Sequence, residues 1–183
     1  MKILLLDGTK DERMSAVPLH LSQNFELRII DTITPDLKIM CQKYDTWDNI
    51  PDKELYQAMD VAIDDITSAI EEFKPDVILG HDYGAAVLSN LVVDSIWSGG
   101  CVYLNPEGMF YGPRSSEKLE KFISLKSYWV FRKTDKSSAK KTIEKLPHYK
   151  SGVSVFVNDK IGVDSILDCG VLSSIMHAVE TRQ

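Results

Sequence analysis

Short apolar runs alternate with amphipathic stretches along the whole chain. Most of these runs are apolar rather than alternating with polar residues, which predicts a parallel sheet covered on both faces. The expected strands, in chain order, are Ile3–Leu6, Phe25–Ile30, Val77–Leu79, Cys101–Leu104, Tyr128–Phe131 and Val153–Val157.

The clearest helix pattern begins near Pro51 and ends before Pro75. Proline is favoured in the first turn of a helix, and the apolar residues that follow recur at steps of three and four. Acidic side chains occupy the opposite face, so the segment predicts one long amphipathic helix. Its apolar face consists of Leu55, Met59, Ile63, Ile66, Ile70 and Phe73.

Weaker patterns predict further helices between the other strands. Pro18 falls inside the first of them, so that helix is short, kinked or starts late. The segment Thr34–Ile50 has no clean period and is interpreted as a structured loop or short helices. The remaining expected helices are Arg13–Ser22, Ala85–Trp97, Ser116–Ile123, Ser137–Leu146 and Val163–Val179.

The succession of strands and helices predicts an α/β fold. Buried strands joined by helices form a three-layer sandwich around a mainly parallel sheet, here of six strands. We expect the second strand at one edge, followed by the first, third, fourth, fifth and sixth. No repeat, low-complexity tract or linker divides the chain, so residues 1–183 are expected to form a single domain.

Composition narrows the range of partners. The chain is 44% hydrophobic and 26% charged, with a formal net charge of −6 and an isoelectric point near 5.2. Nucleic acid is bound through basic surfaces, so an acidic chain argues against such a partner. No apolar stretch approaches the length of a membrane span. The sequence therefore predicts neither a nucleic-acid nor a membrane partner, and it leaves the oligomeric state open.

Three cysteines, Cys41, Cys101 and Cys169, show no metal-ligand spacing. They are interpreted as reduced, mostly buried thiols, which favours a cytoplasmic location. No cofactor is expected, and a small-molecule ligand or substrate is the expected partner.

Candidate chemistry lies just after the expected strands, because ligands of parallel sheets bind outside the carboxyl ends of the strands. Asp7, Asp82, Asp135 and Asp159 could converge there on Mg²⁺ or Ca²⁺, but separate caps and turns are favoured and no metal site is predicted. The segments at these ends are Asp7-Gly8, Asp31-Thr32, His81-Asp82, Asn105-Pro106, Lys133–Asp135 and Asn158-Asp159.

The segment Gly80-His81-Asp82-Tyr83-Gly84-Ala85-Ala86 directly follows a buried strand and opens an apolar helix. It resembles the Gly-His-Asp-Trp/Tyr-Gly-Ala nucleophile elbow of epoxide hydrolases and haloalkane dehalogenases, which belong to the α/β-hydrolase superfamily. In that elbow a strained residue holds its side chain over the sheet, and small residues two before and two after it are required. The length of the chain, without a cap insertion, resembles the small single-domain members.

The resemblance implies roles for individual residues. Asp82 would be the nucleophile, and Asp135, just after the fifth expected strand, would be the catalytic acid. The backbone N–H groups of Gly8 and Tyr83 would form the oxyanion hole. Asp7, His81 and Asp159 are the other candidate pocket residues. Simpler roles remain open: Asp82 in an inert elbow, and Asp135 as a helix N-cap before Ser137.

The histidine of the expected triad is missing from its usual place. It should follow the last strand, where the chain reads Asn158–Gly162, a stretch without histidine. The four histidines are His20, His81, His148 and His177, and the histidine before the nucleophile is usually structural in the family.

Without a base to activate water, hydrolysis of an ester formed on Asp82 is expected to be slow. Two functions therefore follow from the sequence. One is a hydrolase of a small ester, epoxide or related substrate, and the other is a non-catalytic relative that binds a ligand or a protein partner.

Overall fold

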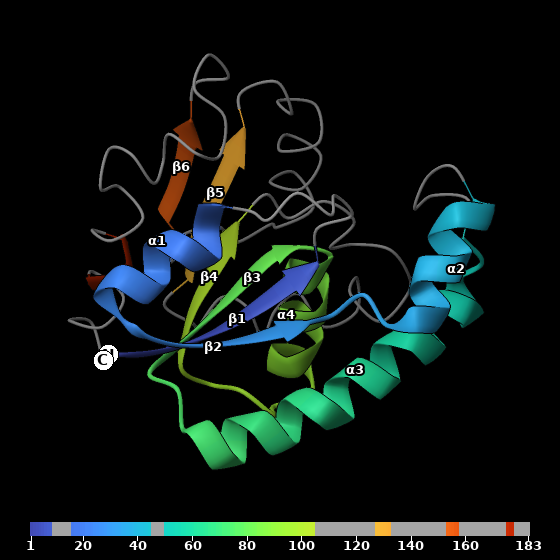
Figure 1. Ribbon diagram of the computed structural model, residues 1–183, viewed down its shortest axis with the longest axis horizontal. Coiled ribbons are helices and arrows are strands. Elements are labelled where there is room, and N and C mark those ends of the chain that lie inside the picture. Colours follow the sequence, from blue (N-terminus) through green and yellow to red (C-terminus); the bar gives the residue numbers. More distant parts are fainter. Residues whose placement is uncertain (9–15, 45–49, 105–126, 133–152, 158–174, 178–183) are drawn as a thin grey trace.

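A computed structural model describes residues 1–8, 16–44, 50–104, 127–132, 153–157 and 175–177. Strands and helices alternate along these residues (Figure 1). The elements are β1 (Lys2–Gly8), α1 (Ala16–Asn24), β2 (Glu26–Asp31), α2 (Pro35–Lys43), α3 (Asp52–Phe73), β3 (Val77–Asp82), α4 (Tyr83–Val93), β4 (Gly100–Leu104), β5 (Ser127–Arg132) and β6 (Val153–Val157).

The strands form one sheet in the order β2-β1-β3-β4-β5-β6, and every neighbouring pair is parallel. The α/β class and the parallel sheet expected from the sequence are confirmed. From β1 the chain moves to one side to form β2 and then crosses to the other side to form β3. The strand order therefore reverses between β1 and β3, and the carboxyl ends of these two strands form the switch point at which ligands of such sheets bind.

Two apolar clusters cover the two faces of the sheet. Successive side chains of β1 point to opposite faces, so Leu4 and Leu6 belong to one cluster while Ile3 and Leu5 belong to the other. The first cluster includes residues of α2, α3 and α4, and the second includes residues of α1 together with Ile175 and Met176. In Figure 1 α1 correspondingly lies on one side of the sheet, with α3 and α4 on the other.

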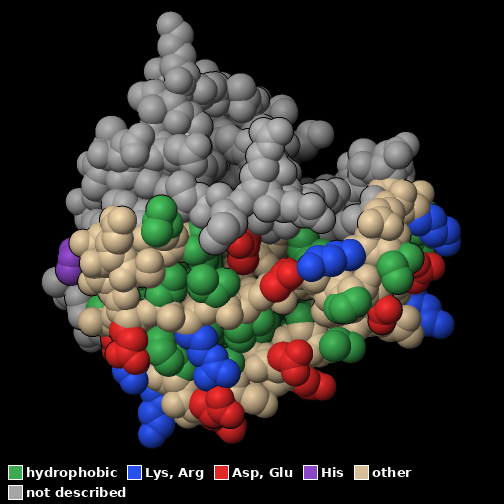
Figure 2. All heavy atoms as spheres, viewed as in Figure 1, with side chains coloured by type: hydrophobic (Ala, Val, Ile, Leu, Met, Phe, Trp, Pro, Cys, Tyr) green, Lys and Arg blue, Asp and Glu red, His purple; other side chains and the backbone are tan. Residues whose placement is uncertain are grey.

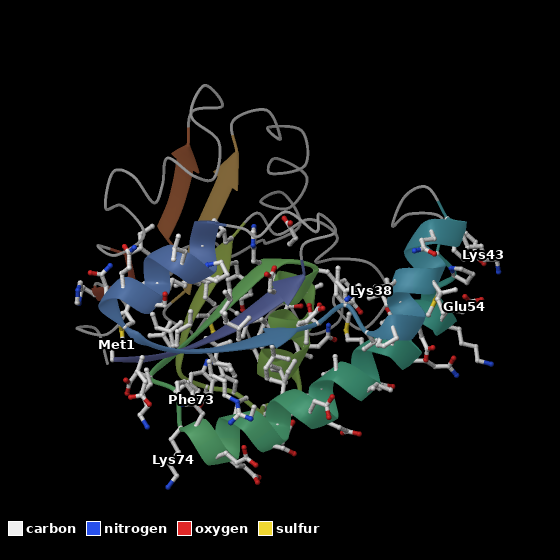
Figure 3. The ribbon with its side chains drawn as sticks, in the orientation of Figure 1. Met1, Lys38, Lys43, Glu54, Phe73 and Lys74 are labelled. Carbon is white, nitrogen blue, oxygen red and sulfur yellow. The ribbon has the colours of Figure 1, made fainter. Side chains whose placement is uncertain are left out.

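The long helix α3 agrees with its sequence pattern, because Leu55, Met59, Ile63 and Ile66 are buried and Ile70 and Phe73 pack against the same cluster. It ends at Phe73, where Lys74 adopts a left-handed conformation (φ 51°) and donates its backbone N–H to the carbonyl of Ile70. The N–H of Asp76 then donates to Lys2 O, which ties the end of this connection to the start of β1. Figure 3 shows Phe73 and Lys74 at one end of α3 and Glu54 at the other.

The other helices differ from expectation at their ends. Helix α4 begins at Tyr83 rather than Ala85 and ends at Val93 rather than Trp97. The chain turns because Ser95 adopts φ 63°, and the N–H groups of Ile96 and Trp97 both donate to Leu91 O. Trp97 then packs back against the core, which explains why the apolar pattern continues beyond the helix.

Two short stretches were also ambiguous in the sequence. The described part of the first helix starts at Ala16, with Pro18 in its first turn, and runs on to Asn24. Residues 35–43 form the helix α2, which Thr34 caps by accepting a hydrogen bond from the N–H of Leu37 at 3.3 Å. Thr34 followed by Pro35 is a helix-start signal, which hydrophobic periodicity alone does not detect.

Several expected elements lie outside the described residues. They are the helices Ser116–Ile123 and Ser137–Leu146 and most of Val163–Val179, of which residues 175–177 are described and helical. No helix in the described part of the chain is long and apolar enough to cross a membrane. The face seen in Figure 2 carries acidic and basic side chains dispersed among apolar ones.

The thiol of Cys101 provides a test of the core. It is fully buried on β4, its Sγ donates to Gly99 O at 3.5 Å, and burial raises its pKa from 9.0 to about 12. The unfolded chain loses this proton as the pH rises through 9, whereas the folded chain keeps it until about 12. The free energy of unfolding should therefore fall across this range, by up to about 4 kcal/mol from this group.

Urea denaturation at pH 7.5, 9, 10 and 11 measures this loss. The Cys101→Ala variant, which has no thiol at this position, should lose less stability over the same range, although its stability at pH 7.5 is lower. Parallel losses in the two proteins would contradict the assignment.

Candidate functional site

The site begins with the pairing of β1 and β3 at the switch point. In the parallel register Asp7 is opposite His81, and Gly8 is opposite Asp82. Two pairs that are far apart in the sequence are therefore neighbours at the carboxyl edge of the sheet. The expectation that Asp7 and Asp82 share this edge agrees with the register, whereas Asp135 and Asp159 lie outside the described residues.

Asp82 joins β3 to α4 in a strained backbone conformation. Its φ is 49° and its ψ is −116°. Two other non-glycine residues in the described part have positive φ, Lys74 and Ser95, and both follow the end of a helix, whereas Asp82 precedes the start of one. A conformation of this kind costs about 1–3 kcal/mol and persists only where the surrounding structure imposes it. The expected unfavourable backbone angles at Asp82 are confirmed.

The carboxylate of Asp82 does not serve as a helix cap. No side-chain hydrogen bond from this residue caps α4, although Asp82 occupies the N-cap position. The side chain is 21% exposed. A carboxylate at this position lies at the positive end of the α4 dipole, which stabilises its charged form. The strain at Asp82 is thus not explained by helix capping.

Three glycines impose the turn through backbone contacts. A Cβ atom on Gly84 would lie 1.9 Å from the carbonyl oxygen of Leu6, and one on Gly8 would lie 2.2 Å from the nitrogen of Gly84. A Cβ on Gly80 would lie 2.6 Å from the oxygen of Gly84. Because no side chain fits at these points, the first turn of α4 rests directly on β1 and β3.

His81 lies between the two carboxylates. Its side chain is buried, with 5% exposed, and its Nδ1 is 3.7 Å from Asp7 Oδ1. Its Nε2 is 3.8 Å from Asp82 Oδ2. Each ring nitrogen therefore faces one carboxylate oxygen. The sequence placed His81 beside Asp82, but it gave no sign that the ring also faces Asp7, because that contact depends on the pairing of β1 with β3.

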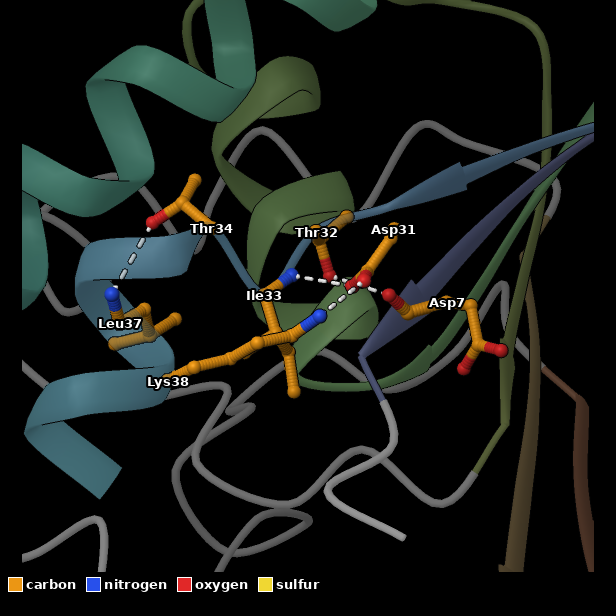
Figure 4. A network of polar contacts seen from close by, with 7 residues as sticks. All are labelled: Asp7, Asp31, Thr32, Ile33, Thr34, Leu37 and Lys38. Carbon is orange, nitrogen blue, oxygen red and sulfur yellow. Dashed lines mark hydrogen bonds and ion pairs between the residues drawn. The ribbon is translucent and has the colours of Figure 1, made fainter. Parts of the chain in front are cut away.

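The end of β2 holds Asp7 in place (Figure 4). Both the N–H and the Oγ1 of Thr32 donate to the backbone oxygen of Asp7 at 2.8 Å. The carboxylate of Asp31 has other partners, since its Oδ1 accepts from the N–H of Ile33 at 2.8 Å and its Oδ2 pairs with Lys38 at 3.0 Å. Asp31 is therefore a turn residue, and Thr32 supports the site through the backbone of Asp7.

His177, whose neighbours Ile175 and Met176 pack with α1, lies away from Asp7, His81 and Asp82. His177 is exposed and contacts the ring of Phe25, at the amino end of β2, with 5.4 Å between ring centroids. His177 therefore lies at the surface, away from the carboxyl edge of the sheet. His148 and the side chain of His20 lie outside the described residues. Within the described residues no group of three or more histidine, cysteine or acidic side chains has the arrangement of a metal site.

Comparisons with known proteins support the fold and leave the family open. No protein-family profile matches the chain. The solved structure of TT1662 from Thermus thermophilus is similar over 98% of this chain and 88% of its own, with a TM-score of 0.63 and 14% identity, which shows a shared fold.

This chain matches only part of the length of a curated relative. The UDP-N-acetylglucosamine 2-epimerase of Neisseria meningitidis serogroup A is 25% identical over 191 aligned positions, which cover 91% of this chain. The chain spans about half the length of that enzyme, namely 48%.

Substitution of Gly84, which lies against the backbone of Leu6, tests how the turn between β3 and α4 is held. Gly84→Ala should lower the free energy of unfolding by at least about 3 kcal/mol, because the new Cβ would meet the backbone of Leu6, which cannot move aside. Alanine ordinarily stabilises a helix relative to glycine. A loss of stability in Gly84→Ala can therefore be attributed to the contact with Leu6.

Gly99→Ala is the matched control. A Cβ on Gly99 would meet the Trp97 ring, which is a side chain and not backbone, so the loss should be smaller than in Gly84→Ala. Chemical denaturation measures both variants, and equal losses would show that the Gly84 contact is not special.

Proposed function

We propose that this chain is a small α/β-hydrolase-fold protein without a cap domain, in which Asp82 is the covalent nucleophile acting on a small ester, epoxide or related substrate. The observation that carries the proposal is the strained backbone of Asp82 at the switch point of the sheet. Three glycines maintain this strain, and the side chain it presents does not cap the helix. Strain of this kind is concentrated at functional sites.

The proposed chemistry has two steps. In the first, a carboxylate oxygen of Asp82 attacks a carbon of the epoxide, the C–O bond breaks, and the alkoxide takes a proton from water. In the second, water hydrolyses the resulting ester and restores the carboxylate. For an ester substrate the attack would occur at the carbonyl carbon, and the developing oxyanion would need donors.

Gly8 and Tyr83 are the proposed oxyanion donors. Their backbones are in contact, since a Cβ on Gly8 would lie 2.7 Å from the carbonyl carbon of Tyr83. Tyr83 is also the first residue of α4, where the helix dipole favours negative charge. Asp135 remains the proposed acid of the site by its position after β5, and Asp159 remains a proposed pocket residue. No cofactor is required by this chemistry.

Two other functions compete with this one. A non-catalytic relative would keep the turn and bind a ligand there, and the absence of histidine from Asn158–Gly162 favours it. The likeness to a UDP-N-acetylglucosamine 2-epimerase suggests a nucleotide sugar at the same edge. The carboxylates of Asp7 and Asp82 oppose a diphosphate at that place, because like charges repel there.

Covalent trapping tests the nucleophile. Incubation with styrene oxide, followed by intact-mass measurement and peptide mapping, should place one adduct on Asp82. The Asp82→Asn variant should form none, because the amide is a poor nucleophile.

Asp31→Asn is the matched control, since it removes a carboxylate from the end of the neighbouring strand. This variant should form the adduct as the unmodified protein does. An adduct that persists in Asp82→Asn, or that maps to other residues, would contradict the proposal.

A further inference from the structure

We infer that His81, oriented by Asp7, is the general base that releases the ester from Asp82. This inference rests on the proposed function and supplies the group that the sequence lacks after the last strand. The base would come from the residue next to the nucleophile, and Asp7 of the neighbouring strand β1 would replace Asp135 as its orienting acid. Nucleophile, base and orienting acid would then all lie at the switch point of the sheet.

The geometry has the order that a nucleophile, a base and an orienting group require. Asp82 Oδ2 is 3.8 Å from His81 Nε2, and His81 Nδ1 is 3.7 Å from Asp7 Oδ1. A proton on Nδ1 directed at Asp7 leaves Nε2 as the basic nitrogen, on the side of Asp82. The carboxylates of Asp7 and Asp82 are each 21% exposed, so water reaches both ends of the array.

The position of His81 is fixed by the sheet rather than by a loop. It lies in β3, paired with Asp7 of β1, and its side chain is almost fully buried. Thr32 holds the backbone of Asp7 with two hydrogen bonds. Of the two histidines whose side chains are described, His177 is near the amino end of β2, and only His81 lies at the carboxyl edge.

The release step can be written with every atom accounted for. Water gives a proton to His81 Nε2 as its oxygen bonds to the carboxyl carbon of Asp82. The tetrahedral intermediate then collapses, the ester C–O bond breaks, and the leaving alkoxide takes the proton from Nε2. His81 is restored as a neutral ring, and Asp82 is left as a carboxylic acid. Its proton goes to the hydroxide that formed when the alkoxide of the first step took a proton from water, so Asp82 is again a carboxylate and an epoxide and water have become a diol.

The test separates formation of the adduct from its decay. Each protein reacts with styrene oxide under single-turnover conditions, and intact mass follows the adduct while chromatography follows the diol. In His81→Gln the adduct should form as before but decay on the order of 10²–10⁴-fold more slowly, which is the usual contribution of a general base. A merely structural role for His81 would not change the decay rate selectively.

A thermal melt and one further variant keep the test decisive. His81 is buried, so a thermal melt checks that His81→Gln is folded. If it is not, Asp7→Asn takes its place, because Asp7 is partly exposed and the amide keeps its shape. The adduct in Asp7→Asn should also decay more slowly than in the unmodified protein, because the ring has lost its orienting charge.

The controls are His177→Gln and Asp31→Asn, which change the same residue types outside the array. The Asp31 carboxylate contacts Ile33 and Lys38, and the adducts in both controls should decay at the unmodified rate. Equal decay in the unmodified protein and the His81 and Asp7 variants would overturn the role of His81 while leaving Asp82 as the nucleophile. If no protein forms an adduct and none produces diol, the nucleophile proposal fails, and the inference fails with it.

Discussion

The close contact between Gly84 and the backbone of Leu6 determines how α4 meets the sheet. An ordinary side chain at this point would force the helix away from β1, and the chain would leave β3 at a different angle. With the contact in place, α4 begins directly after β3, and Asp82 is both the last residue of the strand and the N-cap of the helix. The backbone strain at Asp82, its exposure at the switch point and its position beside His81 all follow from this contact.

Different parts of β1 and β3 provide the stability of the fold and carry the proposed chemistry. The side chains of β1 and β3 fill two apolar clusters, whereas the ends of the same strands carry Asp7, His81 and Asp82. Buried polar groups and a strained residue both lower stability, and the apolar strands directly below them offset that cost. The site is therefore built on the most buried part of the described structure and not on a loop.

Much of this could be predicted from the sequence because it depends on local patterns. Continuous apolar runs predicted the buried strands, and the spacing of Leu55, Met59 and Ile63 predicted α3. Gly80 and Gly84 on either side of Asp82 predicted the strain, since only glycine tolerates such close contact with a neighbouring backbone.

What the sequence could not supply depends on contacts between distant segments or on single backbone angles. The approach of His81 to Asp7 results from the register of β1 with β3, which no spacing along the chain encodes. The end of α4 depends on a left-handed conformation at Ser95, and serine carries little signal for it. Thr32 carries no sequence signal beyond its place after a strand, and its role depends on two hydrogen bonds that it donates to the backbone oxygen of Asp7.

The central claim is that Asp82 is held in a strained conformation for the sake of its carboxylate. Comparing Asp82→Gly with Asp82→Ala by chemical denaturation tests it most directly, since both remove the carboxylate and only alanine keeps the Cβ. At ordinary positions alanine is the more stabilising residue by roughly 0.5–1 kcal/mol. Here the glycine variant should be the more stable by at least about 1 kcal/mol, because glycine adopts φ 49° without strain. An alanine variant as stable as the glycine variant, or more stable, would contradict the account.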